Sequence, residues 1–84
     1  MHYEVQFKGT PAEMEAQAVL EVKDRLGERG VKSLQMARKS LVNSNEPPDA
    51  RRRMAMFFCR MNGISGYGLA VAVENFMVGE HDVF

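Results

Sequence analysis

The segment DARRRMAMFFCRMNG, residues 49–63, holds the most chemically distinctive side chains of this 84-residue chain. Three consecutive arginines stand just before a run of methionine, phenylalanine and cysteine. Arginine can contact the phosphate backbone of a nucleic acid, and arginine and methionine are both enriched at protein–protein interfaces. The segment is therefore compatible with a nucleic-acid site, a protein-binding surface, or the two faces of an ordinary amphipathic helix.

A helical projection of this segment shows that the arginines do not form one patch. One face collects apolar side chains and is expected to point into the core: Ala50, Met54, Phe57, Phe58 and Met61. The opposite face collects Arg52, Arg53, Met56, Cys59 and Arg60, with Arg51 at the border. A solvated helix face ordinarily carries polar side chains, so an apolar methionine among arginines is unusual there. The predicted partner-binding residues are Arg52, Arg53, Met56 and Arg60.

The remaining reactive side chains do not form a catalytic or metal-binding set in the sequence. His2 and His81 stand near opposite ends and lack the spacing of metal ligands, so no metal and no cofactor is expected. Cys59 is the single cysteine, has no nearby histidine in sequence, and is expected to be an ordinary thiol. The glycine-rich stretch at residues 63–68 lacks the Lys-Ser/Thr of a phosphate-binding loop. We therefore expect no catalytic residues and no enzymatic activity.

Length and charge set further limits. The composition, 45% hydrophobic and 26% charged, predicts one globular domain spanning residues 1–84, with a core thin enough to favour dimerisation. The formal net charge is zero, but residues 23–60 carry a net charge of +6 between two segments of −3 each. A basic middle can bind an acidic partner, or it can pair with the acidic ends of its own chain.

The sequence also bears on the compartment. No segment reaches the roughly 18 consecutive apolar residues that would cross a bilayer. The amino-terminal MHYEVQF alternates in polarity and does not resemble a signal peptide. A single cysteine suits a reducing environment. We expect a cytoplasmic protein.

Hydrophobic periodicity divides the first half of the chain into three elements. Residues 2–8 alternate strictly and predict a half-buried β-strand. Thr10, Pro11 and Glu13 predict the capping box of a helix that ends at Gly27 or Gly30. Its expected core residues are Met14, Ala18, Val19, Val22 and Leu26. A second helix is expected over residues 31–44, with Val31, Leu34, Ala37, Leu41 and Val42 inward. Arg38 falls in the same arc, so we expect it at a rim or paired.

The second half contains one clear helix and one ambiguous segment. Two prolines in NSNEPPD predict a turn, with a helix starting at Pro48 or Asp49 and ending at Asn62-Gly63. Residues 65–78 fit a helix or a strand. A helix would align Leu69, Ala72, Val73, Phe76 and Met77 and end at Gly79, whereas a strand would alternate Tyr67, Leu69, Val71 and Val73.

Together these elements predict a mainly helical α+β fold, with one amino-terminal strand followed by three or four amphipathic helices. A lone strand cannot satisfy its backbone hydrogen bonds. We therefore expect the strand to pair with the carboxy-terminal tail or with a second chain, which favours a homodimer.

The order of a short strand, a proline-initiated helix, a glycine and another helix covers about the first 43 residues. This layout resembles that of ribbon-helix-helix repressors and antitoxins. The resemblance implies that paired strands of a dimer enter the major groove, where Gln6 and Lys8 would contact base edges. Glu4 on the same face fits that role only if it accepts a hydrogen bond from a cytosine amine.

Two functional hypotheses follow. The first is a small non-enzymatic regulator or inhibitor, of a kind common in phages and mobile elements, that binds a protein with an acidic surface. The alternative is a dimeric DNA-binding transcriptional regulator of ribbon-helix-helix layout.

Overall fold

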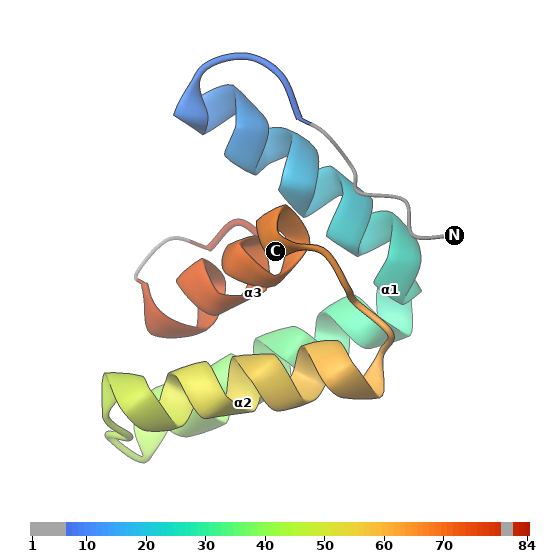
Figure 1. Cartoon of the computed structure of the whole chain (residues 1–84). Coiled ribbons are helices and arrows are strands. Elements are labelled where there is room, and N and C mark those ends of the chain that lie inside the picture. The colour runs from blue at the N-terminus through green and yellow to red at the C-terminus, as the bar shows by residue number, and fades with distance from the viewer. Residues whose placement is uncertain (1–6, 80–81) are drawn as a thin grey trace.

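The computed structural model describes residues 7–79 and 82–84, and these residues form three α-helices. They are α1 (Pro11–Asn43), α2 (Pro48–Met61) and α3 (Tyr67–Val78). Figure 1 shows that α1 is bent, so that its two halves lie on different sides of α3, and that α2 runs beneath α3 in this view. Both α1 and α2 pack against α3, which is therefore the centre of the fold.

The predicted α+β class is wrong, because the described chain is all-α. Residues 2–6 of the expected strand lie outside the described residues, and Phe7 and Lys8 have no regular secondary structure. The Phe7 ring packs on α3 instead, 3.1 Å from the position that a Cβ of Gly68 would occupy. The Lys8 carbonyl accepts a hydrogen bond from Gln17 Nε2 of α1 at 2.8 Å, so a side chain satisfies it in place of a neighbouring strand.

The capping signals at the start of α1 are confirmed. Thr10 is the N-cap, and its hydroxyl oxygen accepts a hydrogen bond from the Glu13 backbone N–H at 3.3 Å. Glu13 Oε1 in turn accepts from the Thr10 backbone N–H, which completes the capping box. The expected end of the helix at Gly27 or Gly30 is instead a bend at Gly27, after which the helix resumes.

The ambiguous tail segment is helical. Its five predicted core side chains are all buried: Leu69, Ala72, Val73, Phe76 and Met77. Gly79 is the C-cap, as the helical alternative expected. The core around α3 takes Ala18, Val19 and Val22 from the first half of α1, Leu34 from the second half, Ala55 and Cys59 from α2, and Ile64 from the connecting turn.

Arg38 fastens the carboxy-terminal segment to α1. Its side chain is 15% exposed and pairs with Asp82, while Nη2 donates a hydrogen bond to the Gly79 carbonyl at 3.0 Å. The guanidinium carbon lies 4.7 Å from the centre of the Phe76 ring, a cation–π contact. Phe84 stacks edge-on against the same ring at 5.1 Å. The expectation of a paired Arg38 is therefore confirmed.

Replacing Arg38 with alanine removes these hydrogen bonds and leaves the Gly79 carbonyl with one donor fewer. We predict that Arg38→Ala lowers the free energy of unfolding by about 1–3 kcal/mol, measured by urea denaturation. Lys39→Ala is the control, because Lys39 is exposed on the same helix and should change stability by less than about 0.5 kcal/mol. Equal effects of the two substitutions would contradict the role given to Arg38.

Candidate protein-interaction surface

The orientation of α2 decides which of its side chains can meet a partner. Ala55 and Cys59 are its buried residues, 1% and 6% exposed, and they pack in the core around α3. Small side chains at the contact let two helices approach closely, whereas large ones hold them apart. The side of α2 that faces the core is thus its small-residue side.

The predicted inward face of α2 is therefore wrong for three of its five residues. Met54, Phe57 and Met61 point to solvent, with 38%, 57% and 68% of their surface exposed. Phe58 and Ala50 are half-buried at the edges of the contact. Cys59, expected on the outer arc, is in the core.

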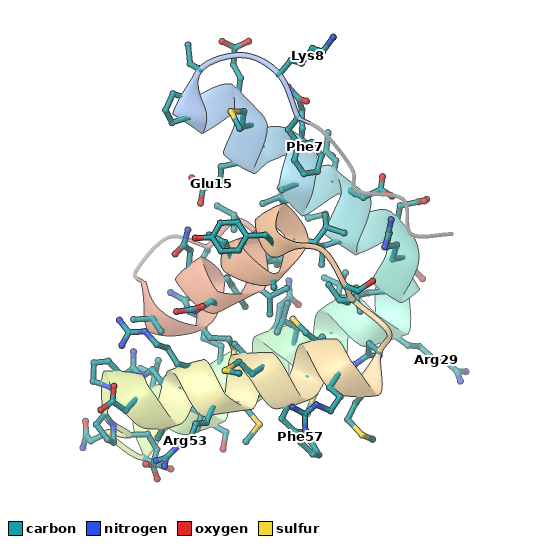
Figure 2. All side chains as sticks on the ribbon, in the orientation of Figure 1. Phe7, Lys8, Glu15, Arg29, Arg53 and Phe57 are labelled. Carbon is teal, nitrogen blue, oxygen red and sulfur yellow. The ribbon has the colours of Figure 1, made fainter. Side chains whose placement is uncertain are left out.

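We define the α2 outer face as Arg53, Met54, Phe57, Arg60 and Met61. The spacing of three and four residues places its three apolar side chains in one strip along the helix. Arg53 and Arg60 run beside that strip on one side. Figure 2 shows Arg53 and Phe57 extending from the side of α2 that faces away from α3. The face combines exposed apolar surface with positive charge.

The four arginines of α2 differ in what they already contact. Arg51 Nε donates a hydrogen bond to the Glu46 carbonyl at 3.1 Å. Arg52 pairs with Glu74 of α3 at 3.0 Å and with Asp49 at 3.4 Å. Among the residues that the structure describes, Arg53 and Arg60 have no ion-pair partner.

The predicted binding residues therefore separate into two groups. Arg52 forms an ion pair between α2 and α3. Arg53 and Arg60 are exposed and form no ion pair with the described residues, and Met56 is exposed beside them. Met56, 61% exposed, lies between Arg52 and Arg60 on the flank of the α2 outer face. Sequence reasoning missed Met54, Phe57 and Met61, because apolar residues at helical spacing are ordinarily assigned to the core.

Cys59 is unsuited to nucleophilic chemistry. Burial raises the pKa of its thiol above the ordinary value, and the Glu74 carboxylate raises that pKa further. The thiol therefore stays neutral near pH 7, and only the thiolate is strongly nucleophilic.

The other residues singled out from the sequence lie elsewhere or outside the described chain. Lys8 is exposed at the opposite end of the molecule from Arg53, as Figure 2 shows. Gln6, His2 and His81 lie outside the described residues. Within residues 7–79 and 82–84, no three histidine, cysteine or carboxylate side chains gather in a metal-binding arrangement. Among the residues that the structure describes, none of the three helices combines the length and the hydrophobicity that a transmembrane span requires.

A surface hollow of about 520 Å³ lies between α1 and the carboxy-terminal segment, against Gln35, Arg38, Lys39 and Phe84. Arg38 is already bound there by Asp82 and the Gly79 carbonyl. The hollow is therefore a weaker candidate for an anionic ligand than the α2 outer face is for a partner.

Comparison with known proteins adds no relative: no protein-family model, curated protein or solved structure matches this chain. A functional inference therefore rests on the geometry of the α2 outer face.

The raised pKa of Cys59 makes stability depend on alkaline pH. Above the ordinary thiol pKa, the unfolded chain loses a proton that the folded protein still holds, so stability falls as pH rises. Below that pKa both states are protonated and the thiol contributes no pH dependence. We predict a larger loss of unfolding free energy between about pH 7.5 and pH 9.5 for the wild-type protein than for Cys59→Ala. If urea denaturation shows that both proteins lose the same unfolding free energy over this range, the raised pKa of Cys59 is contradicted.

Proposed function

We propose that this protein is a small non-enzymatic regulator or inhibitor that binds another protein through the α2 outer face. The single observation that carries the proposal is Phe57, an aromatic side chain that is 57% exposed beside Arg53 and Arg60. Aromatic residues and arginine are the commonest energetic anchors of protein interfaces. The exposed Met54 and Met61 extend the same surface along the helix.

The shape of the strip supports a particular kind of contact. Apolar residues at positions i, i+3 and i+7 are the anchors by which a helix docks into a groove or against another helix. Burying them removes apolar surface from water, which contributes roughly 25 cal/mol per Å² before the cost of association is subtracted. A partner element that runs along α2 is therefore favoured over one that touches a single point.

The charge of the face supports an acidic partner. Burying Arg53 and Arg60 against an uncharged surface would leave two guanidinium groups without water and without counter-charges, which is unfavourable. Carboxylates beside the apolar strip of the partner would form charge-assisted, two-pronged hydrogen bonds with them. The partner we propose therefore presents acidic side chains along the edge of an apolar groove or helix.

A nucleic acid is less well suited to this face. Phosphates would attract Arg53 and Arg60, but a phosphate backbone offers little to an apolar strip of three large side chains. Of the two residues implied by the ribbon-helix-helix resemblance, Lys8 lies far from the α2 outer face. The sheet-forming fold that the resemblance implied is also not the fold described above. DNA binding is retained as an alternative outcome of the test.

We predict that Arg53→Glu/Arg60→Glu weakens partner binding by about 30-fold or more, because each arginine would face a carboxylate of like charge. Candidate partners would be captured by the immobilised protein from the cells that produce it and identified by mass spectrometry. Each would then be purified and its dissociation constant measured by calorimetry. Phe57→Ser should weaken the same binding through loss of the central anchor.

Arg29→Glu/Lys39→Glu is the matched control, since it makes the same change of net charge at exposed positions of α1. This control should bind within about threefold of the wild-type protein. Equal losses in the two double variants would contradict the assignment to the α2 outer face. Salt-dependent binding of a generic DNA duplex at micromolar protein concentration, without any protein partner, would favour the DNA-binding alternative.

A further inference from the structure

The bend in α1 depends on a backbone conformation that is essentially restricted to glycine. Gly27 has φ 70° and ψ 179°, although the residues on both sides are helical. Side chains other than hydrogen are strongly disfavoured in this region of backbone space. Apart from the adjoining backbone of α1 and the two neighbouring residues, no heavy atom lies within 4 Å of the position that a Cβ of Gly27 would occupy, so tertiary packing does not constrain the residue. Backbone preference alone limits which residue can hold the bend.

A second glycine makes the same bend possible. A Cβ placed on Gly30 would lie 2.7 Å from the Leu26 Cβ, too close for two carbon atoms. In a straight helix, side chains four residues apart have their Cβ atoms about 5–6 Å apart. The close approach at Gly30 therefore belongs to the bent form and would be relieved if α1 straightened.

Straightening would also align the two halves of α1 into one apolar stripe. Val19, Val22 and Leu26 precede Gly30, and Leu34, Ala37 and Leu41 follow it. Successive members of this series, with Gly30 included, are three or four residues apart, which is the spacing of one helix face. The bent and straight forms thus use the same apolar residues.

We propose that Gly27 is a hinge through which this protein exchanges the first half of α1 with a second copy of itself. In a straight α1, the side chains of Ala18, Val19 and Val22 would leave α3 and be exposed to water. The α3 of a second copy already has the surface that fits them, because the single chain buries them there. Exchange would restore every core contact and change only the hinge, the condition under which domain swapping is favoured.

The exchange has a consequence for binding. The α2 outer face lies away from α3, so the swapped dimer would present two copies of that face. Two linked sites can engage a partner with two matching surfaces far more tightly than one site can. The proposal stands independently of the proposed function, because it rests on α1 and α3 and not on the α2 outer face.

The test is Gly27→Ala, with molar mass measured by size-exclusion chromatography and light scattering. Alanine is disfavoured in the bend and favoured in a helix, so the equilibrium should shift toward the straight form by at least about 30-fold. We expect a dimer at concentrations where the wild-type protein is a monomer. Gly63→Ala is the matched control, since Gly63 also has positive φ (65°) and open space around its Cβ, but lies in the turn after α2. It should lower stability without changing the mass.

A distance measurement separates the swapped dimer from any other dimer. Spin labels at Gln17→Cys and Lys39→Cys, in a Cys59→Ala background, would flank the hinge at exposed positions of α1. A straight helix holds their backbones about 33 Å apart, and the bend shortens that distance. Gly27→Ala diluted with unlabelled protein should give the longer distance. A folded monomer, or a dimer with the short distance, would overturn the proposal.

If Gly27→Ala does not fold, the exchange is tested on the wild-type protein. Refolding it from urea at millimolar concentration should trap a dimer fraction that chromatography separates from the monomer, with the long distance across the hinge. Recovery of monomer alone would overturn the proposal.

Discussion

Burial of α3 inside the bend of α1 is the constraint on which the rest of the structure depends. The helix has five buried side chains along its twelve residues, and neither half of α1 alone supplies all of its cover. Ala18, Val19 and Val22 approach it from one half of α1 and Leu34 from the other. That arrangement requires α1 to turn sharply, which only glycine at position 27 permits without strain. Arg38 and the carboxy-terminal segment then close the end of α3.

The same constraint explains the chemistry of the surface. α2 packs on the remaining side of α3 through Ala55 and Cys59, and the Arg52–Glu74 ion pair joins the two helices at the exposed edge of that contact. Phe57 and its neighbouring methionines are consequently turned to solvent beside two arginines. An exposed apolar strip reduces solubility and adds nothing to the stability of the single chain, which is why we propose that a partner covers it. The core therefore determines the candidate site.

The features that were predicted correctly from the sequence are those that neighbouring residues determine. The capping box at Thr10 and the helix start at Pro48 depend on residues within a few positions, and the buried face of α3 follows the local spacing of its apolar side chains. The orientation of α2 could not be predicted, because both of its faces carry apolar residues and only packing against α3 selects the smaller ones. The amino-terminal strand was predicted from alternation, but Phe7 alternates with polar neighbours while packing on a helix. In each failure a contact distant in sequence prevails over the local pattern.

The orientation of α2 is the central claim, and the methionine methyl groups test it most directly. Carbon-13 methyl labelling with a soluble paramagnetic agent would report by NMR which methionines meet water. Met54 and Met61 should broaden strongly, whereas Met77, which is fully buried, should be protected. Protection of Met54 and Met61 in the monomeric protein would mean that this side of α2 faces the core. That result would remove the α2 outer face and the function proposed for it.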